Sequence, residues 1–440
     1  MKLSRIAEIT GGLLIGDDAD VRVEASLDSR EVPEGGLFAA LVGENVDGHR
    51  YVSSAFENGA AAALVSEQVE ERPLIVVDDV QAALGALAAV HVAEHRDHLT
   101  VIGVTGSMGK TTTKDLLAGI LPGPTVATAK SLNNELGMPL TALRSDSGTR
   151  YLILEMGADR PGDLAYLTSL VAPDVAVVLA VGSAHLQNFG TQDAVAEAKA
   201  ELVDGLADGG IAILNAADPR VAAMAERAER VLMFGRDVRA EDIQIDDLGR
   251  AAFDLVAPGG RAHVELGLIG PHHVFNALAA AAVASCVGVD TESVARSLSG
   301  RVAASPHRMN VAERADGVTV IDDSYNANPQ SMNAALEVLA RVGRGRRTIA
   351  VLGPMLELGE ASESEHIAVG KRLTELEIDV VHLLGPIAAE MAPPGIETHV
   401  HETLDGIRAA LNEQVRSGDV LLFKSSNGAR LHVVAEEWAA

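Results

Sequence analysis

The sequence predicts an α/β fold of three domains, in which a small N-terminal α/β unit precedes two larger units built on parallel sheets. The length of 440 residues exceeds what one hydrophobic core ordinarily serves and is typical of about three domains. Short apolar runs alternate with helical or polar segments in two series, one from about residue 100 and one from about residue 309. Such alternation is typical of a doubly wound, mostly parallel sheet. We place the domains at residues 1–85, 86–308 and 309–440.

The composition narrows the class of protein. Hydrophobic residues at 48% and charged residues at 22% are typical of a soluble globular chain. The first residues carry no uninterrupted apolar run, so we expect no signal peptide, and the alanine-rich stretches are too short to insert into a membrane. With one cysteine, Cys286, the chain cannot form an internal disulfide, which indicates the reducing cytoplasm. We expect Cys286 to be a helical residue that is buried in the core. A net charge of −27 argues against a nucleic-acid partner.

The N-terminal unit is predicted from three short apolar runs broken by glycines. These runs read LFAALVG, AAALVSE and PLIVVDD, and their lengths favour strands of a small sheet. A helical pattern, QAALGALAAVHVAEHRD, follows them and is expected to pack on the next domain or join it.

The central unit is predicted from five apolar runs flanked by Gly, Asp or Asn, which indicate buried strands of a parallel sheet. They read TVIGVTG, RYLILEMG, DVAVVLAV, GIAILN and RVLMFG. Residues 250–270 predict a hairpin with a Pro-Gly-Gly turn, and HHVFNALAAAAVASCVG predicts a helix. In the last unit, VTVIDDS, RTIAVLG, DVVHLLG and DVLLFKS repeat the alternation and predict a doubly wound, Rossmann-like domain.

The segment VTGSMGKTTTK, residues 104–114, stands between a predicted strand and a predicted helix. A glycine-rich turn lets backbone N–H groups surround an anion, and the helix N-terminus adds its positive dipole end. Lys110 would then reach the outer phosphates and Thr111 would ligate Mg²⁺. The fit to G-x-x-x-x-G-K-[ST] is imperfect, since Val104 stands five residues before Gly109. A nucleotide phosphate is favoured over a plain structural turn.

Polar residues follow several predicted strands, where ligands of open parallel sheets collect. They are Glu155, His185, Asn215, Asp218, Asp322, Asp323 and Tyr325. The pattern favours an enzyme, although each residue has a structural alternative. Glu155 could be solvated or could hold Mg²⁺, His185 could be structural, and Lys199 reads by composition as an exposed lysine of a helix.

A set of longer motifs resembles one family. It comprises TGSMGKTTTK, SLNNELGMPLTALR, LEMGADRPGDLAYL, AHLQNFGTQDAVAEAKAEL, GPHHVFNALAAAA, DDSYNANPQSMNAAL and PMLELGEASESEH. Together these resemble the Mur ligases of peptidoglycan synthesis over nearly the whole chain and in the family's order. The family's loop, TG[ST]xGKT, accounts for the imperfect fit. DDSYNANP with its following SM resembles the type that joins D-alanyl-D-alanine to UDP-N-acetylmuramoyl-tripeptide.

The resemblance implies a set of site residues. For ATP they are Thr105, Gly106, Ser107, Met108, Gly109, Lys110, Thr111, Thr112, Asn276, Arg308 and Asp323. For two Mg²⁺ ions they are Thr111, Glu155, His185 and Lys199, with Lys199 as a carbamate. The catalytic residues would be Lys110, Glu155, His185 and Lys199. For the other substrates they are Ser29, Arg30, Asp47, His49, Asn133, Asn134, Tyr325, Asn326 and Asn328. Departures from the family's pattern are Met108, His273, His307 and KSSNGARL.

The implied activity is an ATP-dependent peptide ligase that works through an acyl phosphate, at the final cytoplasmic step of peptidoglycan precursor synthesis. It implies a role in cell-wall biogenesis, and hence in cell shape and division, and we expect a monomer. Alternatives are a ligase that adds a diamino acid, a folate polyglutamate ligase, and a non-catalytic nucleotide-binding scaffold. The chain lacks the D-N-P-R and GTNGKGS elements of the first two, and it keeps the lysines, Glu155 and His185 that a scaffold would lose.

Overall fold

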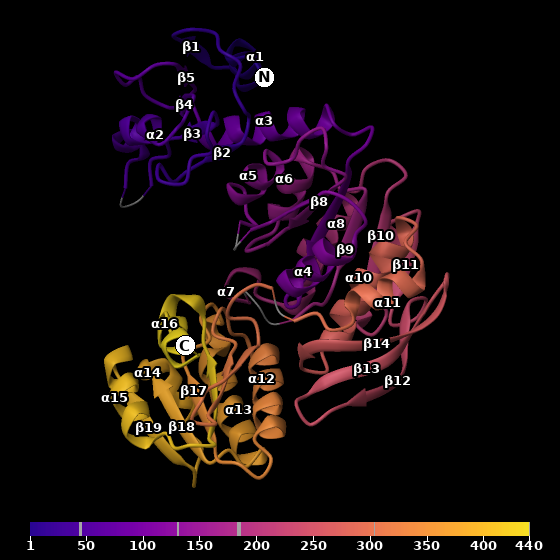
Figure 1. Cartoon of the computed structure of the whole chain (residues 1–440), viewed down its shortest axis with the longest axis vertical. Helices are drawn as coiled ribbons and strands as arrows, with labels where there is room; N and C mark the ends of the chain where they lie inside the picture. Colours follow the sequence, from indigo (N-terminus) through magenta and orange to yellow (C-terminus); the bar gives the residue numbers. More distant parts are fainter. Residues whose placement is uncertain (44–45, 130–131, 183–185, 303, 440) are drawn as a thin grey trace.

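The computed structural model describes residues 1–43, 46–129, 132–182, 186–302 and 304–439. Over these residues the chain forms four β-sheets, of five, six, three and six strands. Figure 1 shows the five-stranded N-terminal sheet at the top and the C-terminal sheet at the lower left, with the other two sheets on the right. Within the described ranges, every helix is too short or insufficiently apolar to cross a membrane.

The N-terminal domain is the small α/β unit that the sequence predicts. Its sheet has the order β1-β5-β4-β3-β2, and β1 is antiparallel to β5 while the other pairs are parallel. The strands are β1 (Leu13–Ile15), β2 (Ala25–Ser26), β3 (Leu37–Ala39), β4 (Ala62–Val65) and β5 (Leu74–Val76). Helix α1 (Leu3–Thr10) covers one face and α2 (Val52–Glu57) the other, so alternate residues of β4 enter two different cores.

Helix α3 (Val80–Ala93) joins this domain to the next, as Figure 1 shows. The Asp79 side chain caps it by accepting a 3.0 Å hydrogen bond from the backbone N–H of Ala82. The helix packs against α1 and also against α5 (Gly137–Ala142) and α6 (Asp163–Leu170) of the central domain. The domain boundary placed at residue 85 therefore falls inside this helix. The helix belongs to a hydrophobic core whose residues come from both domains, from Leu3 to Met224.

The central sheet is parallel throughout, with the order β11-β10-β9-β6-β8-β7, and contains all five predicted strands. Its strands are β6 (Thr100–Thr105), β7 (Thr125–Ala127), β8 (Tyr151–Glu155), β9 (Val175–Val178), β10 (Ile211–Asn215) and β11 (Val231–Phe234). The remaining helices up to β11 are α4 (Lys110–Ile120), α7 (Leu186–Phe189), α8 (Gln192–Asp204) and α9 (Pro219–Ala223). The strand order reverses at β6, so ligands are expected beyond its carboxyl end.

A three-stranded antiparallel sheet completes the central domain. Its strands are β12 (Arg239–Ile245), β13 (Arg250–Ala257) and β14 (Gly260–Ile269), and the predicted hairpin is confirmed. Helix α10 (His273–Cys286), also predicted, packs on this sheet and on α4, and α11 (Thr291–Leu298) follows. The expectation that Cys286 lies in the core is wrong: Val283 and Ala284 in the last turn of α10 are buried, but Cys286 is on the exposed side of that turn.

The C-terminal domain is the predicted doubly wound unit. Its sheet has the order β15-β16-β20-β17-β18-β19, and only the β15 pair is antiparallel. The strands are β15 (Asn310–Glu313), β16 (Thr319–Asp322), β17 (Thr348–Leu352), β18 (Val380–Leu384), β19 (Glu397–His401) and β20 (Val420–Lys424). The helices are α12 (Pro329–Val342), α13 (Ser362–Glu375), α14 (Gly385–Ala388), α15 (Leu404–Gln414) and α16 (His432–Ala439). Separate cores lie on the two faces of this sheet.

Candidate active site

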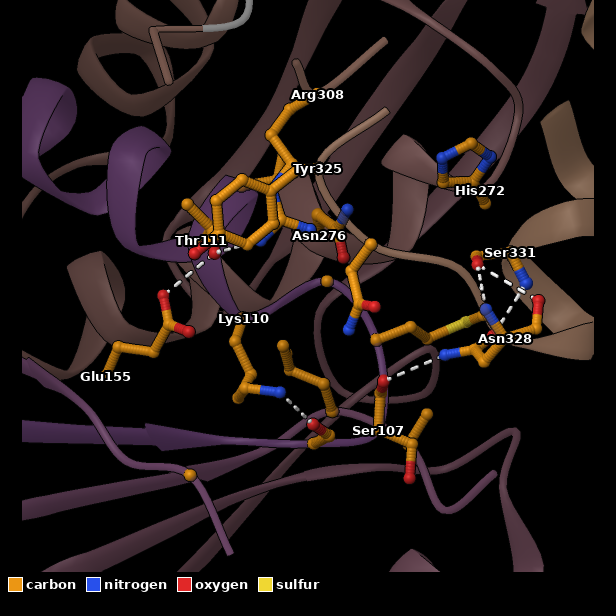
Figure 2. A pocket seen from close by; sticks show the side chains of 18 of the residues that line it. Ser107, Lys110, Thr111, Glu155, His272, Asn276, Arg308, Tyr325, Asn328 and Ser331 are labelled. Atoms are coloured by element: carbon orange, nitrogen blue, oxygen red, sulfur yellow. Dashed lines mark hydrogen bonds between the residues drawn. The ribbon is translucent and has the colours of Figure 1, made fainter. Parts of the chain in front are cut away.

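A cavity of about 470 Å³ lies where the central and C-terminal domains meet. The carboxyl ends of β6 and β8 contribute to it from one side and those of β16 and β20 from the other. The residues proposed from the sequence that line it are Gly106, Ser107, Met108, Gly109, Lys110, Thr111, Thr112, Asn133, Glu155, Lys199, Asn215, Asn276, Arg308, Asp323, Tyr325, Asn326 and Asn328. Figure 2 shows many of these side chains converging on the same space.

The glycine-rich loop of residues 106–111, called the phosphate-binding loop below, connects β6 to the first turn of α4 and lines this cavity. Gly109 has a φ of 81°, and a Cβ there would lie 2.4 Å from Asn276 Oδ1, so only glycine fits at this position. Lys110 Nζ donates a 2.7 Å hydrogen bond to the carbonyl of Gly106, which holds the side chain over the loop (Figure 2). Burial lowers the pKa of Lys110, an effect that the Glu155 carboxylate opposes. An anion bound beside Lys110 would favour its charged form and so raise its pKa. The charged ammonium group would in turn attract the anion.

Glu155, the last residue of β8, is a buried carboxylate with defined partners. Thr111 Oγ1 donates a 2.9 Å hydrogen bond to its Oε2, and Asn133 Nδ2 donates a 3.0 Å bond to its Oε1. Burial without such donors would be costly, so these bonds account for its place in the sheet. The arrangement puts a carboxylate and a hydroxyl oxygen side by side at the cavity wall, and both are oxygen ligands of the type that Mg²⁺ prefers.

Lys199 differs from the exposed lysine that its helical sequence suggests, because α8 turns it inward and buries it. No carboxylate in the described part of the chain forms an ion pair with its ammonium group. Burial, with a smaller contribution from the charge of Lys110, lowers the pKa of Lys199 to about 7. About half of these side chains are therefore neutral amines near neutral pH, and a neutral amine is a nucleophile.

The C-terminal domain contributes a second group of polar side chains. Arg308 Nη2 donates a 3.2 Å hydrogen bond to Thr111 Oγ1, and its guanidinium carbon lies 3.9 Å from the centre of the Tyr325 ring. Asn328 caps α12 and also donates a 3.4 Å hydrogen bond to the carbonyl of Ser107. Lys424 Nζ forms an ion pair with Asp323. Through Arg308 and Asn328 this domain contacts both ends of the phosphate-binding loop (Figure 2).

The far wall of the cavity is formed by the start of α10. Asn276 Nδ2 lies 3.1 Å from His273 Nδ1, and burial lowers the pKa of His273 well below its ordinary value, so its imidazole is neutral. Phe275 is exposed and lines the cavity beside these two residues. An aromatic ring next to an amide is the combination that binds a flat heteroaromatic group.

The four candidates in the N-terminal domain do not line this cavity. His49 Nδ1 lies 2.7 Å from Asp47 Oδ1, and its Nε2 accepts a 3.1 Å hydrogen bond from the backbone N–H of Ser66. The structure thus uses both ring nitrogens within the domain. Arg30 forms an exposed ion pair with Asp28, and Ser29 is buried.

Three further candidates also lie away from the cavity lining or outside the described residues. Thr105 ends β6 with its hydroxyl buried, and the side chain of Asn134 accepts a 3.0 Å hydrogen bond from the backbone N–H of Gly137. His185 lies outside the described residues. Conversely, Phe275, Ser331, Leu356 and Glu357 line the cavity without having been proposed. Leu356 and Glu357 come soon after β17, so the strand-end rule that selected Glu155 would have selected their loop too.

Comparison with known proteins yields matches over most of the chain. The Mur ligase middle domain matches residues 104–284, the Mur ligase glutamate ligase domain residues 307–427, and the Mur ligase family catalytic domain residues 25–93. The UDP-N-acetylmuramoyl-tripeptide--D-alanyl-D-alanine ligase of Mycobacterium tuberculosis is 41% identical, over 100% of this chain and 98% of that one.

Two crystal structures agree with this match. MurF from Acinetobacter baumannii is similar with a TM-score of 0.87 and 32% identity, over 99% of this chain and 97% of that one. MurF from Thermotoga maritima, in complex with ADP, has a TM-score of 0.82 and 33% identity, over 95% and 97% of the two chains. On these grounds, this chain belongs to the Mur ligase family.

Proposed function

We propose that this enzyme joins D-alanyl-D-alanine to UDP-N-acetylmuramoyl-tripeptide at the expense of ATP. The observation that carries the proposal is the single cavity in which the phosphate-binding loop, the buried Glu155–Thr111 pair, Lys199 and Arg308 meet. The relatives that match along nearly the full length carry this activity in their name. The family's role in peptidoglycan precursor synthesis supports a cytoplasmic location for the reaction.

The chemistry requires that a poor electrophile be activated. A carboxylate oxygen of the tripeptide attacks the γ-phosphorus of ATP, ADP leaves, and an acyl phosphate forms. The amino group of D-alanyl-D-alanine then attacks the acyl carbon, inorganic phosphate leaves, and the amine loses a proton. Lys110 and Arg308 both line the cavity, Arg308 in contact with Thr111, and they would balance the charge of the transferring phosphoryl group.

The oxygen donors of the cavity fit a Mg²⁺ ion. Thr111 and Glu155 would hold it, with the remaining positions taken by phosphate oxygens and water, which suits an ion that keeps much of its hydration. Bound there, the ion would neutralise phosphate charge. Asn133 fixes the other carboxylate oxygen through its 3.0 Å hydrogen bond and so orients Glu155 toward Thr111.

Lys199 suits a second role in the same site. Its pKa of about 7 supplies the neutral amine that reacts with CO₂ to form a carbamate and release a proton. The carbamate would convert a buried cation into an anion, and it would join His185 as a ligand of a second Mg²⁺. The Asp159 carboxylate opposes the lowering of the pKa of Lys199, but burial outweighs it, so a share of Lys199 stays neutral and available for this reaction.

The UDP-sugar is assigned to the N-terminal domain, with Ser29, Arg30, Asp47 and His49 as its candidate contacts. Asp47 and His49 would act through the backbone turn that their mutual bond holds, because both nitrogens of His49 have partners within the domain. Tyr325, Asn326 and Asn328, together with Asn133 and Asn134, are the candidates for the peptide and the incoming dipeptide.

The experiment that tests the function is ADP release by the purified protein with a panel of amines. With ATP, Mg²⁺ and a UDP-N-acetylmuramoyl-tripeptide, we expect turnover only when D-alanyl-D-alanine is present. Turnover with a diamino acid on a UDP-N-acetylmuramoyl-dipeptide, or with glutamate on a folate, would replace this proposal by one of its alternatives. Nucleotide binding with no turnover on any substrate would favour a scaffold.

A further inference from the structure

The linker between the central and C-terminal domains is fastened at two closely spaced points. The backbone N–H of Ser305 donates a 3.1 Å hydrogen bond to Asp115 Oδ2 on α4 of the central domain. Two residues later, His307 is bound entirely by groups of the C-terminal domain. The chain therefore passes from one domain to the other between Ser305 and His307, and whatever follows His307 belongs with the C-terminal domain.

The His307 imidazole is clamped between two carboxylates. Its Nδ1 lies 2.7 Å from Asp322 Oδ2 at the end of β16, and its Nε2 lies 3.2 Å from Glu436 Oε1 on α16. Its carbonyl also accepts a 3.2 Å hydrogen bond from the backbone N–H of Tyr325. The side chain is only 13% exposed, so most of its surface packs within the domain.

The backbone around His307 takes a shape that needs external support. His307 and Met309 have φ values of 59° and 56°, in the left-handed region that side chains with a Cβ disfavour. The N–H of Met309 donates a 3.1 Å hydrogen bond to Asp323 Oδ1, which holds the second of these residues. The His307 clamp holds the first.

Arg308 stands between these two left-handed residues and points back toward the central domain. Its guanidinium stacks over Tyr325 and donates to the Thr111 hydroxyl, 197 residues away in the sequence. Figure 2 shows Arg308 and Tyr325 together above Thr111. The direction of the Arg308 side chain thus depends on a turn that His307 secures from outside the cavity, since His307 does not line it.

We propose that His307 is a positioning residue, whose bonds to Asp322 and Glu436 hold the linker turn that presents Arg308 to the phosphate-binding loop. This inference rests on the proposed function, in which Arg308 contacts the phosphates of ATP. It assigns to His307 a task that needs no contact with any substrate. It also makes Arg308 a group that the C-terminal domain delivers to the nucleotide.

Three substitutions of His307 separate the clamp from the backbone conformation. His307→Gly removes the imidazole and accepts the left-handed φ, and His307→Ala removes the imidazole and disfavours that φ. His307→Asn tolerates the φ and keeps one donor nitrogen, that of its side-chain amide. We expect the KM for ATP to rise roughly fivefold to tenfold in His307→Gly, at least as much in His307→Ala, and clearly less in His307→Asn. The KM for the UDP-linked substrate should stay unchanged in all three.

A double-mutant cycle tests whether His307 acts through Arg308. In an Arg308→Ala background, His307→Gly should cause no further rise in the KM for ATP. On α16, Glu436→Gln should raise this KM slightly, whereas the matched change Glu437→Gln should not, because Glu437 pairs with Arg408 at 2.8 Å instead. Thermal unfolding of each variant shows how much stability the clamp contributes.

Several outcomes would overturn the role of His307. These are a wild-type KM for ATP in His307→Gly, a lower unfolding temperature with no change in that KM, and effects of His307→Gly and Arg308→Ala that multiply. Failure of the proposed function looks different, because the wild-type protein would then show no turnover with D-alanyl-D-alanine. In that case the role of His307 is still tested by calorimetry, which compares the affinity of the wild type for ATP with that of His307→Gly.

Discussion

The Thr111 hydroxyl and the Glu155 carboxylate lie 2.9 Å apart although 44 residues separate them in the chain. The pair is brought together because β6 and β8 are hydrogen-bonded neighbours, so α4, which starts after β6, begins beside the last residue of β8. A strand order that placed another strand between β6 and β8 would separate them. The candidate cation site is therefore a product of the sheet topology.

Replacement of Glu155 by glutamine should remove the anion and keep the shape. We expect Glu155→Gln to lower kcat roughly 100-fold or more and to raise the Mg²⁺ concentration needed for half-maximal rate. Steady-state rates over a Mg²⁺ titration measure both effects. Glu197→Gln, on the exposed side of α8, is the control and should behave as wild type. An unchanged Mg²⁺ requirement in Glu155→Gln would remove Glu155 from the cation site.

Lys199 offers a test of the proposed carbamate. Lys199→Ala should abolish ligase activity, since it removes both the amine and the anion formed from it, and short carboxylic acids such as acetate should restore part of the rate. The measurement is ADP release with increasing acetate. Lys199→Ala with acetate should respond, while Lys110→Ala, which loses a phosphate contact instead, should not. Full activity of Lys199→Ala without acetate would contradict the carbamate.

Gly109 tests how closely the phosphate-binding loop approaches α10. Gly109→Ala places a Cβ 2.4 Å from Asn276 Oδ1, so we expect nucleotide affinity to fall more than tenfold. Gly162→Ala is a matched control, because Gly162 also precedes a helix at positive φ but has open space where its Cβ would stand. Calorimetric titration with ADP distinguishes the two. A wild-type ADP affinity in Gly109→Ala would mean that the Asn276 side chain moves aside to accept the Cβ.

A buried histidine makes the C-terminal domain sensitive to acid. Burial, with the neighbouring His399 and His401, lowers the pKa of His382 to about 4, although Glu397 opposes the shift and Arg347 adds to it. Between pH 6.5 and about 4 the unfolded chain binds a proton that the folded domain excludes. The free energy of unfolding must therefore fall as the pH falls through this window, by about 3 kcal/mol in total.

The chain's one tryptophan, Trp438, lies in the same core as Val380 and Leu384, which flank His382, so its fluorescence reports on this domain. The guanidinium concentration at the unfolding midpoint of the wild type should be lower at pH 5 than at pH 7. For His382→Leu the difference between the two midpoints should be smaller. The exposed His263 provides the control, and His263→Gln should match wild type. An equal pH dependence in His382→Leu would assign the acid sensitivity to other groups.

The sequence predicts the fold well where strands are buried on both faces. The centres of runs such as RYLILEMG and DVLLFKS are apolar because helices cover both sides of each parallel sheet, and they are recognisable without any tertiary information. The rule that ligands collect at the carboxyl ends of parallel strands located Glu155 and Asp323, because residues at these ends share one edge of a sheet.

Features that depend on which face of a helix is buried, or on contacts between domains, were harder to predict. AVAEAKAEL gives no sign that Lys199 points inward, since its alanines allow either face to be buried. Helix α10 is apolar on all sides, so the exposure of Cys286 at its end could not be read from the pattern. The clamp on His307 joins residues 15 positions and more apart, and no local signal encodes it.

The core that runs through α3 from Leu3 to Met224 has a consequence for dissecting the molecule. A fragment that starts near residue 100 would expose the apolar sides of α5 and α6 that α3 covers, and should aggregate when expressed alone. Both cores of the C-terminal unit are built from its own residues, apart from Ile269 of β14, which packs against one of them, so a cut in the linker before His307 should yield two pieces that each stay folded.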